Sequence, residues 1–307
     1  MESNPLVTIN ILSFNRKNDL FNTLTKVYEQ DYQNIEVIVV DNASVDGTQS
    51  MVRSSFPSVR LIELQKNIGI TGWNEGFKAA KGEYILFLDD DSFPINKTIS
   101  KGLFALSENI NLGIVAFNVW NTRYKFCETQ NYDETDSLLF CGCGVLIQRE
   151  VFNRINGYDK NYFIYQNELD FAIRAYNAGY KLQYLKDAII YHNQSQVARM
   201  DNDQSPFLSR FRYHHHFLGY YIYLIKNFNS IYFLRYSFKW TINRLIICFK
   251  YPYFFTFLKV ILKILIITPR LIKERKVLNY EVQKHYYFGN MPLIDRSFFP
   301  NFSKKIK

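Results

Sequence analysis

The 307-residue sequence has few cysteines and lacks the signals of several common protein classes. Its four cysteines have no regular spacing, which argues against a disulfide framework. The first residues, MESNPLVTINIL, carry neither the basic segment nor the long apolar segment of a signal peptide, so we expect a reduced, cytoplasmic protein. Because 48% of the residues are hydrophobic, a large core is available and general disorder is excluded.

Two nucleotide-binding signatures are also missing. The chain has no G-x-x-x-x-G-K-[ST] loop, and the segment after its first apolar run, SFNRKN (13–18), contains no glycine. A dinucleotide fold needs G-x-G-x-x-G at that point, so NAD and P-loop chemistry are disfavoured. Cys141 and Cys143 flank a glycine without a matching Cys or His pair elsewhere. We interpret them as small buried thiols, with a metal-ligand pair as the alternative.

Charge is divided unevenly along the chain. Residues 206–307 contain 18 Lys and Arg against 3 Asp and Glu, a balance of +15, whereas residues 1–205 contain 19 against 25, a balance of −6. Basic surfaces bind the phosphates of nucleic acids or of anionic lipids. We therefore predict two domains, an acidic body at 1–205 and a basic, aromatic-rich helical extension at 206–307.

The acidic body alternates apolar runs typical of buried strands with amphipathic segments typical of helices. The expected strands are 6–14, 35–44, 59–67 and 83–91. The expected helices are 17–30, 46–56 and 72–82, the last closed by Gly82. This alternation, with short connections, predicts an α/β fold with a mostly parallel sheet flanked by helices. Ligands of such sheets bind at the carboxyl ends of the strands.

Polar residues follow all four expected strands. They are Ser13, Asn15 and Arg16, then Asp41, then Asn67, and finally Asp89, Asp90 and Asp91. Three adjacent aspartates repel one another unless a positive group offsets their charge. A carboxylate cluster at a strand end suits Mg²⁺ or Mn²⁺, which bind through one or two carboxylates and substrate phosphates. A solvated turn is the alternative interpretation of the aspartates alone.

Four segments in this order resemble family 2 glycosyltransferases of the GT-A fold. They are VTINILSFNR (7–16), VIVVDNASVDGT (37–48), NIGITGWNEGFKAAKGEYILFLDDDSFP (67–94) and NELDFAIRAYNAGYKLQYLKDAIIYH (167–192). The likeness covers about residues 5–195 and is to bacterial members such as rhamnosyl- and galactosyltransferases, many of which have a helical C-terminal extension. It implies an inverting transfer of a sugar from a UDP- or dTDP-sugar to an acceptor hydroxyl, in the synthesis of a cell-surface polysaccharide or glycoconjugate.

The resemblance also implies roles for individual residues in donor binding. Asp41 lies where the family binds the base, and its carboxylate can accept a hydrogen bond from an imide N–H. Trp73 is expected to pack against the sheet. The other implied substrate-binding residues are Ser13, Asn15, Arg16, Asn67, Asn74, Asp89 and Asp90.

Asp89 and Asp91 match the family's D-x-D motif. By resemblance, Asp91 binds a Mn²⁺ or Mg²⁺ ion that bridges the donor phosphates, and Asp89 reaches the ribose or sugar and also contacts the metal. His192 matches a histidine that completes the metal site in several members. A strand-end histidine without a ligand is the alternative.

The segment YQNELDFAIR (165–174) matches the motif that supplies the family's catalytic base. Glu168 stands at the position of the base, whereas Asn167 replaces the acidic residue that the family has before it. Asp170 is the alternative base. Acidic residues are also common at helix starts because the helix dipole favours them, so a helix N-terminus without catalytic function is the plainer interpretation.

The basic extension combines aliphatic and aromatic residues with a Lys or Arg every few positions. It has no uncharged stretch of about 18 residues, so a membrane-spanning helix is not supported. Lys259 and Lys263 would border one apolar helical face, which predicts a helix lying on the inner face of the membrane, where it would suit a lipid-linked or saccharide acceptor. A helix packed on the body is the alternative. Binding of nucleic acid is disfavoured, because the basic residues are interspersed among bulky aliphatic ones. The side chains of residues 214–216 (HHH) would point in different directions around a helix, so we expect a structural or interfacial role for them.

Three other functions stay open at this point. A nucleotidyltransferase would share the nucleotide-binding half but needs a glycine-rich loop after the first strand. A non-catalytic nucleotide-sugar-binding protein would bind the donor without turnover, and Asn167 keeps this hypothesis open. A membrane scaffold that reuses the fold would bind no nucleotide.

Overall fold

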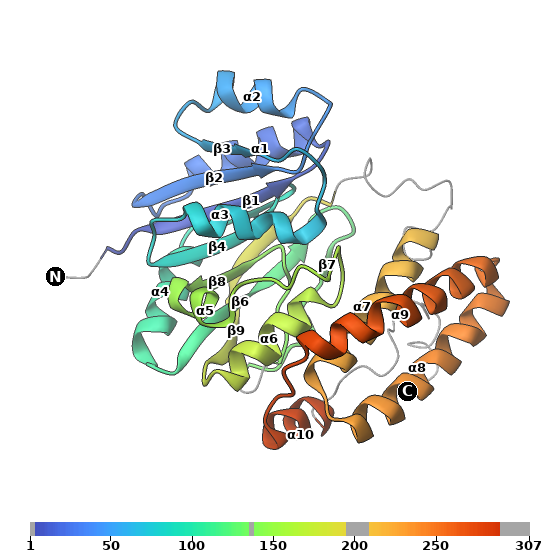
Figure 1. Cartoon of the computed structure of the whole chain (residues 1–307). Coiled ribbons are helices and arrows are strands. Elements are labelled where there is room, and N and C mark those ends of the chain that lie inside the picture. The colour runs from blue at the N-terminus through green and yellow to red at the C-terminus, as the bar shows by residue number, and fades with distance from the viewer. Residues whose placement is uncertain (1–3, 135–137, 195–208, 289–307) are drawn as a thin grey trace. The chain divides into compact units, whose positions relative to one another are not determined.

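The structure is a computed structural model that describes residues 4–134, 138–194 and 209–288 (Figure 1). It divides into two compact units, Met1–Phe163 with Asn167–Ala198, and Ile164–Gln166 with Arg199–Lys307. The domain boundary expected between residues 205 and 206 lies outside the described residues.

The first part of the N-terminal unit has the predicted alternation of strands and helices. Its strands are β1 (Val7–Ser13), β2 (Ile35–Asp41), β3 (Arg60–Glu63) and β4 (Tyr84–Asp89). Its helices are α1 (Lys17–Glu29), α2 (Thr48–Ser55), the 3₁₀ turn η1 (Gly69–Gly72) and α3 (Trp73–Ala79). The strands are parallel and lie in the order β3-β2-β1-β4. This half of the sheet is therefore the predicted parallel α/β arrangement.

The second half of the sheet is mixed in direction. Its strands are β5 (Ser92–Pro94), β6 (Leu112–Asn121), β7 (Phe126–Cys127), β8 (Val145–Gln148) and β9 (Lys181–His192). Its helices are α4 (Thr98–Glu108), α5 (Arg149–Ile155) and α6 (Asn167–Asn177). Strand β8 is antiparallel to both β4 and β6, whereas β9 is parallel to β6. The sheet continues from β4 as β8-β6-β9-β5, with β7 paired to β6.

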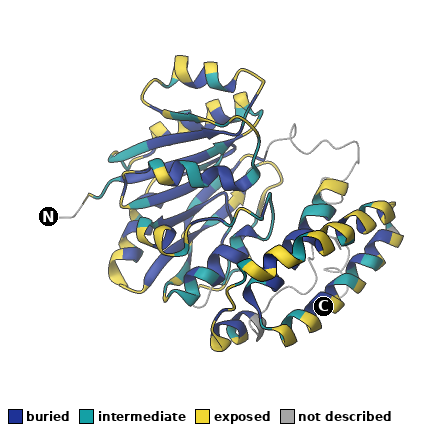
Figure 2. Cartoon of the chain, viewed as in Figure 1, coloured by how far each residue is buried: buried dark blue, intermediate teal, exposed yellow. Residues whose placement is uncertain are grey.

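Apolar side chains cover both faces of this sheet, which explains the near-continuous apolar strands. On one face, Val7, Ile9 and Ile11 of β1 join a core with residues of α1, α2 and α4. On the other face, Phe87 of β4 lies among aromatic rings from α3 and α6, including Trp73 and Phe171. Trp73 therefore packs against the sheet, as predicted. Figure 2 shows the strands buried and the outer turns of the helices exposed.

The end of α3 differs from the prediction. The helix ends at Ala79, and Ala80 follows with an extended backbone, so Gly82 does not close it. Gly82 is needed for a different reason: a Cβ at this position would lie 2.6 Å from the backbone nitrogen of Thr8. The glycine therefore allows the chain to pass close to β1 before β4 begins.

The C-terminal unit is helical, as predicted. It contains α7 (Arg210–Asn227), α8 (Ser230–Lys250), α9 (Phe254–Glu274) and α10 (Tyr280–Phe288). The side chains of Ser209 and Asn229 accept hydrogen bonds from backbone N–H groups in the first turns of α7 and α8, which stabilises these helix starts. Most residues of α7 are buried, and it contacts both α8 and α9. None of the helices in the described part of the chain is long and apolar enough to cross a membrane.

Candidate functional site

The ends of three parallel strands bring predicted residues to one edge of the sheet. Ser13 pairs with Asp41 across β1 and β2, and Leu12 pairs with Asp89 across β1 and β4. These registers place the polar residues that end each apolar run side by side. The strand ends therefore meet where the sequence predicts a ligand.

Asp41 is fully buried, and only one of its carboxylate oxygens is occupied. Oδ2 accepts hydrogen bonds from the backbone N–H of Ser44 at 3.0 Å and from Nε2 of Gln49 at 2.6 Å. Oδ1 has no hydrogen-bond partner among the described residues. A buried acceptor without a partner costs free energy unless a donor reaches it. This oxygen can therefore receive an N–H from a bound base.

The loop after β1 is connected to the loop after β2. Asn15 has a left-handed backbone with φ of 52°, its N–H donates to the Ser44 hydroxyl at 2.8 Å, and its Oδ1 accepts from the backbone N–H of Val45 at 2.8 Å. Asparagine tolerates this backbone conformation better than most residues. Asn15 therefore connects the loop that follows Ser13 to the loop that follows Asp41.

The two other predicted asparagines bond to the protein backbone. Oδ1 of Asn67 accepts from the N–H of Gly69 at 2.8 Å and shapes the turn before η1. The amide of Asn74 donates to the carbonyl of Tyr158 at 2.8 Å and accepts from its N–H at 2.9 Å. These contacts give Asn74 a structural function, holding the segment that precedes α6.

The positive group beside the three aspartates is Arg16. Its Nη1 lies 2.8 Å from Oδ1 of Asp90 and 3.0 Å from Oδ2 of Asp91. Burial, opposed by Arg16 and aided by the charges of Asp91 and Asp89, raises the pKa of Asp90 to about 7. The carboxylate of Asp90 also accepts from the N–H of Phe14 at 3.3 Å. Arg16 and Asp90 thus tie the end of β1 to the end of β4.

Asp89, Asp91 and His192 form the predicted metal-binding group. One ligand atom from each lies within 4.8 Å of the others, on oxygen and nitrogen donors that suit Mn²⁺ or Mg²⁺. Nε2 of His192 lies 3.2 Å from Oδ1 of Asp91. Strand β5 pairs with β9 so that Ser92 lies opposite His192, which brings the distant histidine to the aspartates. These residues fit a divalent cation.

Glu128 is a site residue that the sequence analysis missed. Its Oε1 lies 2.7 Å from Nδ1 of His192 and also accepts from Nδ2 of Asn121 at 2.7 Å. Burial lowers the pKa of His192, but the hydrogen bonds to Asp91 and Glu128 outweigh it and raise the pKa to about 11. Glu128 follows a two-residue strand, too short to be found from an apolar pattern.

The two predicted catalytic carboxylates lie in different surroundings. Burial raises the pKa of Glu168 to about 7; a backbone hydrogen bond opposes this rise, and the charge of Asp89 adds to it. Asp170 is buried and accepts from Nε of Arg174 at 2.8 Å, with Nη2 at 2.7 Å. Arg174 also donates to two backbone carbonyls. Glu168 thus has the raised pKa of a general base or acid, and Asp170 is part of a structural ion pair.

Gly142 leaves space for the side chain of Glu168. The sequence analysis did not predict this contact. A Cβ at this glycine would lie 2.8 Å from Oε1 of Glu168. The neighbouring thiols Cys141 and Cys143 are free, and their sulfur atoms are 3.1 Å apart. Cys143 is buried, as expected for a core thiol, and it also lies within 4.8 Å of ligand atoms of Glu128 and His192. The thiols are thus those expected from the sequence, and β9 brings His192 near Cys143, which keeps the alternative of a metal ligand open.

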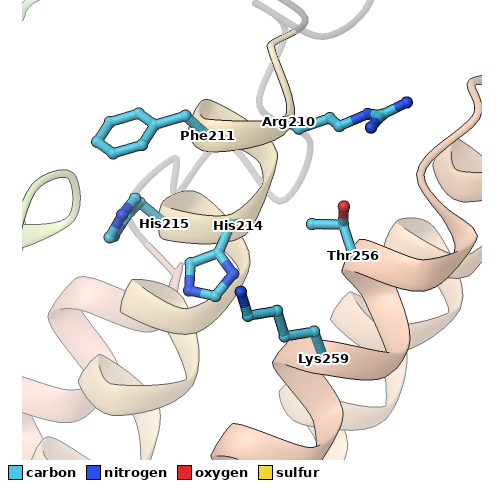
Figure 3. A pocket seen from close by; sticks show the side chains of 6 residues that line it. All are labelled: Arg210, Phe211, His214, His215, Thr256 and Lys259. Atoms are coloured by element: carbon cyan, nitrogen blue, oxygen red, sulfur yellow. The ribbon is translucent and has the colours of Figure 1, made fainter.

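The surface of the C-terminal unit combines basic and apolar groups. A hollow of about 310 Å³ between α7 and α9 is lined by Arg210, Phe211, His214, His215, Thr256 and Lys259 (Figure 3). Burial, together with the charges of Lys263 and Lys259, lowers the pKa of His214 to about 4. His216 is instead buried, with its ring 4.1 Å from that of Tyr165. His214 and His215 thus line one hollow, whereas His216 packs against Tyr165.

The sequence and fold match known glycosyltransferases. Residues 8–156 match the Glycosyl transferase family 2. The chain is 37% identical over 98 residues to WfaP of Escherichia coli, a UDP-Glc:alpha-D-GlcNAc-diphosphoundecaprenol beta-1,3-glucosyltransferase; the match covers 31% of this chain and 39% of WfaP. The match thus spans less than half the length of that relative.

Two solved structures share the fold at low identity. The mannosyltransferase PcManGT from Pyrobaculum calidifontis, in complex with GDP-Man and Mn²⁺, has a TM-score of 0.59 at 19% identity, covering 86% of this chain and 76% of its own. Residues 1–349 of S. aureus TarS, in complex with UDP-GlcNAc, have a TM-score of 0.58 at 15% identity, covering 80% and 73%. The sheet is therefore that of a GT-A fold. With the family match, this chain carries a domain, at residues 8–156, that matches the Glycosyl transferase family 2.

Proposed function

We propose that the protein is an inverting, metal-dependent glycosyltransferase that moves a sugar from a UDP- or dTDP-sugar to an acceptor hydroxyl. The observation that carries this proposal is the convergence of three kinds of group in the N-terminal unit. These are an unpartnered buried oxygen on Asp41, a group of hard-cation ligands around Asp91, and a carboxylate of raised pKa on Glu168. Each suits one part of a nucleotide-sugar reaction.

The base of the donor would bind at Asp41. Its free Oδ1 accepts the imide N–H that uracil and thymine share, and the two bases differ only at a methyl group that this oxygen does not contact. Ser13, at the end of β1, lies beside Asp41 in the strand register. Asn15 orders the loops around them. This arrangement favours UDP and dTDP donors without choosing between them.

Asp89, Asp91 and His192 would hold the Mn²⁺ or Mg²⁺ ion. When bound, such a cation neutralises the charge that develops on a leaving diphosphate. Arg16 adds a fixed positive charge at the same edge and keeps Asp90 and Asp91 in place. His192 is oriented by Glu128, which bonds to its other ring nitrogen, as a supporting residue commonly does in metal sites.

Glu168 would remove the proton from the attacking acceptor hydroxyl. Its pKa near 7 allows it to be ionised in a large fraction of molecules at neutral pH while remaining basic enough to accept a proton. Attack on the anomeric carbon as the diphosphate leaves inverts the configuration in one step. Asp170 is bound to Arg174, and so we propose that it supports α6 and is not the base.

The acceptor would be a saccharide or a lipid-linked saccharide used in cell-surface polysaccharide or glycoconjugate synthesis. The name of WfaP includes a diphosphoundecaprenol-linked acceptor, which is a membrane lipid. In this chain, α8 and α9 expose large apolar side chains, among them Ile231, Leu234, Phe238, Phe255, Leu258 and Leu262. Lys259 and Lys263 accompany them, whereas Glu274 is the sole acidic residue between positions 230 and 274.

We propose that this surface lies on the anionic inner face of the cell membrane. Apolar side chains would enter the interface, and the lysines would meet lipid phosphates, an arrangement typical of interfacial helices. The basic hollow at Arg210 and Lys259 offers a place for one such phosphate (Figure 3).

Calorimetric binding of UDP, dTDP, GDP and CMP tests the donor site directly. Each nucleotide is titrated with Mn²⁺ and with EDTA into wild type, Asp91→Asn and, as a control, Asp187→Asn, which changes an exposed carboxylate paired with Lys101. We expect UDP or dTDP to bind only with Mn²⁺ and only when Asp91 is present. Binding that ignores both Mn²⁺ and Asp91 would refute the site. Donor binding without any sugar transfer or donor hydrolysis would favour the non-catalytic binding protein.

A further inference from the structure

A second group of metal-ligand atoms lies beside the first and shares His192 with it. Glu128, Cys143 and His192 each offer one ligand atom, and these atoms lie within 4.8 Å of one another. The two ring nitrogens of His192 face different partners: Nε2 is 3.2 Å from Asp91, and Nδ1 is 2.7 Å from Glu128. One imidazole therefore stands between two possible cation sites.

The two groups differ in donor chemistry. Asp89 and Asp91 offer oxygen, which Mg²⁺ and Mn²⁺ prefer, whereas Cys143 adds sulfur to an imidazole and a carboxylate. Thiolate, imidazole and carboxylate together are the ligands that Zn²⁺ takes in proteins. Cys143 and His192 are only 3% and 4% exposed, so both donors are shielded from water.

The surroundings of Cys143 favour a cation over a lone thiolate. Cys143 lies beside Glu128, and the carboxylates of Asp89 and Asp91 lie around the shared His192. A divalent cation would compensate these negative charges while the thiol loses its proton.

We propose that Glu128, Cys143 and His192 bind Zn²⁺. We also propose that this zinc weakens the binding of Mn²⁺ or Mg²⁺ by Asp89, Asp91 and His192. Binding releases the thiol proton of Cys143 and the Nδ1 proton of His192 to solvent. A neutral imidazole has a lone pair on only one nitrogen, so Zn²⁺ on Nδ1 leaves Nε2 protonated and unable to bind a second metal. Zinc occupancy would therefore withdraw His192 from Asp89 and Asp91. The opposing effect rests on the proposed function, whereas zinc binding does not.

Cobalt titration of the metal-free full-length protein tests the site, because a thiolate ligand gives Co²⁺ a charge-transfer band. We expect this band in wild type and in Cys248→Ala, a control that removes an equally buried thiol from α8. It should be absent in Cys143→Ala and Cys143→Ser. Zinc affinity, measured by competition with a chromophoric chelator, should fall at least about tenfold in both Cys143 variants and stay unchanged in the control.

Manganese binding, followed by the paramagnetic resonance signal of free Mn²⁺, tests the opposition between the sites without turnover. One equivalent of Zn²⁺ should weaken Mn²⁺ binding in wild type and should have little effect in Cys143→Ala. Retained UDP binding with Mn²⁺ would show that the variants fold. A cobalt spectrum without the thiolate band, or zinc affinity that is the same without Cys143, would overturn the proposal. If the protein binds zinc through Cys143 but binds no nucleotide, the zinc site would be upheld and only the proposed transferase function would be rejected.

Discussion

Glu168 and Asp170 are two positions apart, but their surroundings suit them to different roles. Glu168 is suited to proton transfer, and Asp170 to an ion pair that stabilises the structure. Both lie in the first turn of α6, where acidic residues are favoured in any helix. Glu168 has a pKa raised to about 7, mainly by burial. Asp170 is held by Arg174, which also binds backbone carbonyls. The spacing of the two residues in the sequence cannot distinguish these environments, whereas their three-dimensional contacts do distinguish them.

Replacing Glu168 with Gln should lower kcat by about 10²–10⁴-fold, because the proton acceptor is lost. Mn²⁺-dependent UDP binding should be unchanged. In wild type, kcat should rise as pH increases through about 7, since the base is protonated below its pKa. The control, Asp170→Asn, should instead lower the free energy of unfolding by about 3–5 kcal/mol, because the charge of Arg174 loses its buried carboxylate partner. A flat pH profile, or a Glu168→Gln variant with normal kcat, would contradict the assignment.

Gly142 gives a second prediction at the scale of one residue. The methyl group of Gly142→Ala would lie 2.8 Å from Oε1 of Glu168 and should push the carboxylate aside. A misplacement of about 1 Å can reduce turnover by about 10²-fold. We expect lower kcat with unchanged donor affinity and a nearly unchanged melting temperature, measured by steady-state kinetics, calorimetry and thermal unfolding. Equal losses of donor affinity and stability would indicate a general disruption of the loop.

At the scale of elements, the loop after β1 and the end of β4 depend on each other through charge. Arg16 bonds to Asp90 and Asp91, and Asp90 accepts from the backbone of Phe14. The three aspartates at one strand end are therefore tolerated because Arg16, in the loop after the neighbouring strand β1, lies beside them. The pair of strands β5 and β9 then brings His192 to the same place.

Replacing Arg16 with Met should lower the free energy of unfolding by about 3–5 kcal/mol, because two buried carboxylates lose their partner. The loss should be larger at pH 8 than at pH 6, since Asp90, with a pKa raised to about 7, is neutralised as pH falls. Added Mn²⁺ should recover part of the loss. Chemical unfolding at both pH values measures these effects. Arg53→Met, which breaks an exposed pair with Glu63, should cost only about 0–1 kcal/mol and depend little on Mn²⁺.

At the scale of the whole molecule, the chain combines an acidic α/β unit with a basic helical unit. The exposed apolar residues of α8 and α9 recur along both helices, as Figure 2 shows by their exposed positions. Lysines, with almost no acidic residues, accompany them. This composition is typical of a surface that meets an anionic lipid layer.

Changing Lys259 and Lys263 together to Ala should weaken binding to vesicles containing anionic phosphatidylglycerol by about 30-fold, since each lysine contributes about 1 kcal/mol near such a surface. Binding to neutral phosphatidylcholine vesicles should be weak for wild type and variant alike. Vesicle flotation at low and physiological salt measures this. The matched control is Lys78→Ala with Lys101→Ala, two lysines of the N-terminal unit, which should bind as wild type does. Equal binding to both kinds of vesicle would reject the electrostatic docking.

The sequence by itself determined the α/β alternation, the edge of the sheet that carries the site, the family and the helical extension. It could do so because buried strands and amphipathic helices have local patterns, and because the polar residues follow the strands directly. The mixed second half of the sheet, the partnership of Arg16 with Asp90 and Asp91, and the different environments of Glu168 and Asp170 were decided by tertiary structure. So were the contacts of Glu128, Gly142 and Cys143, because pairing between distant strands brings these residues together and leaves no periodic signal in the chain.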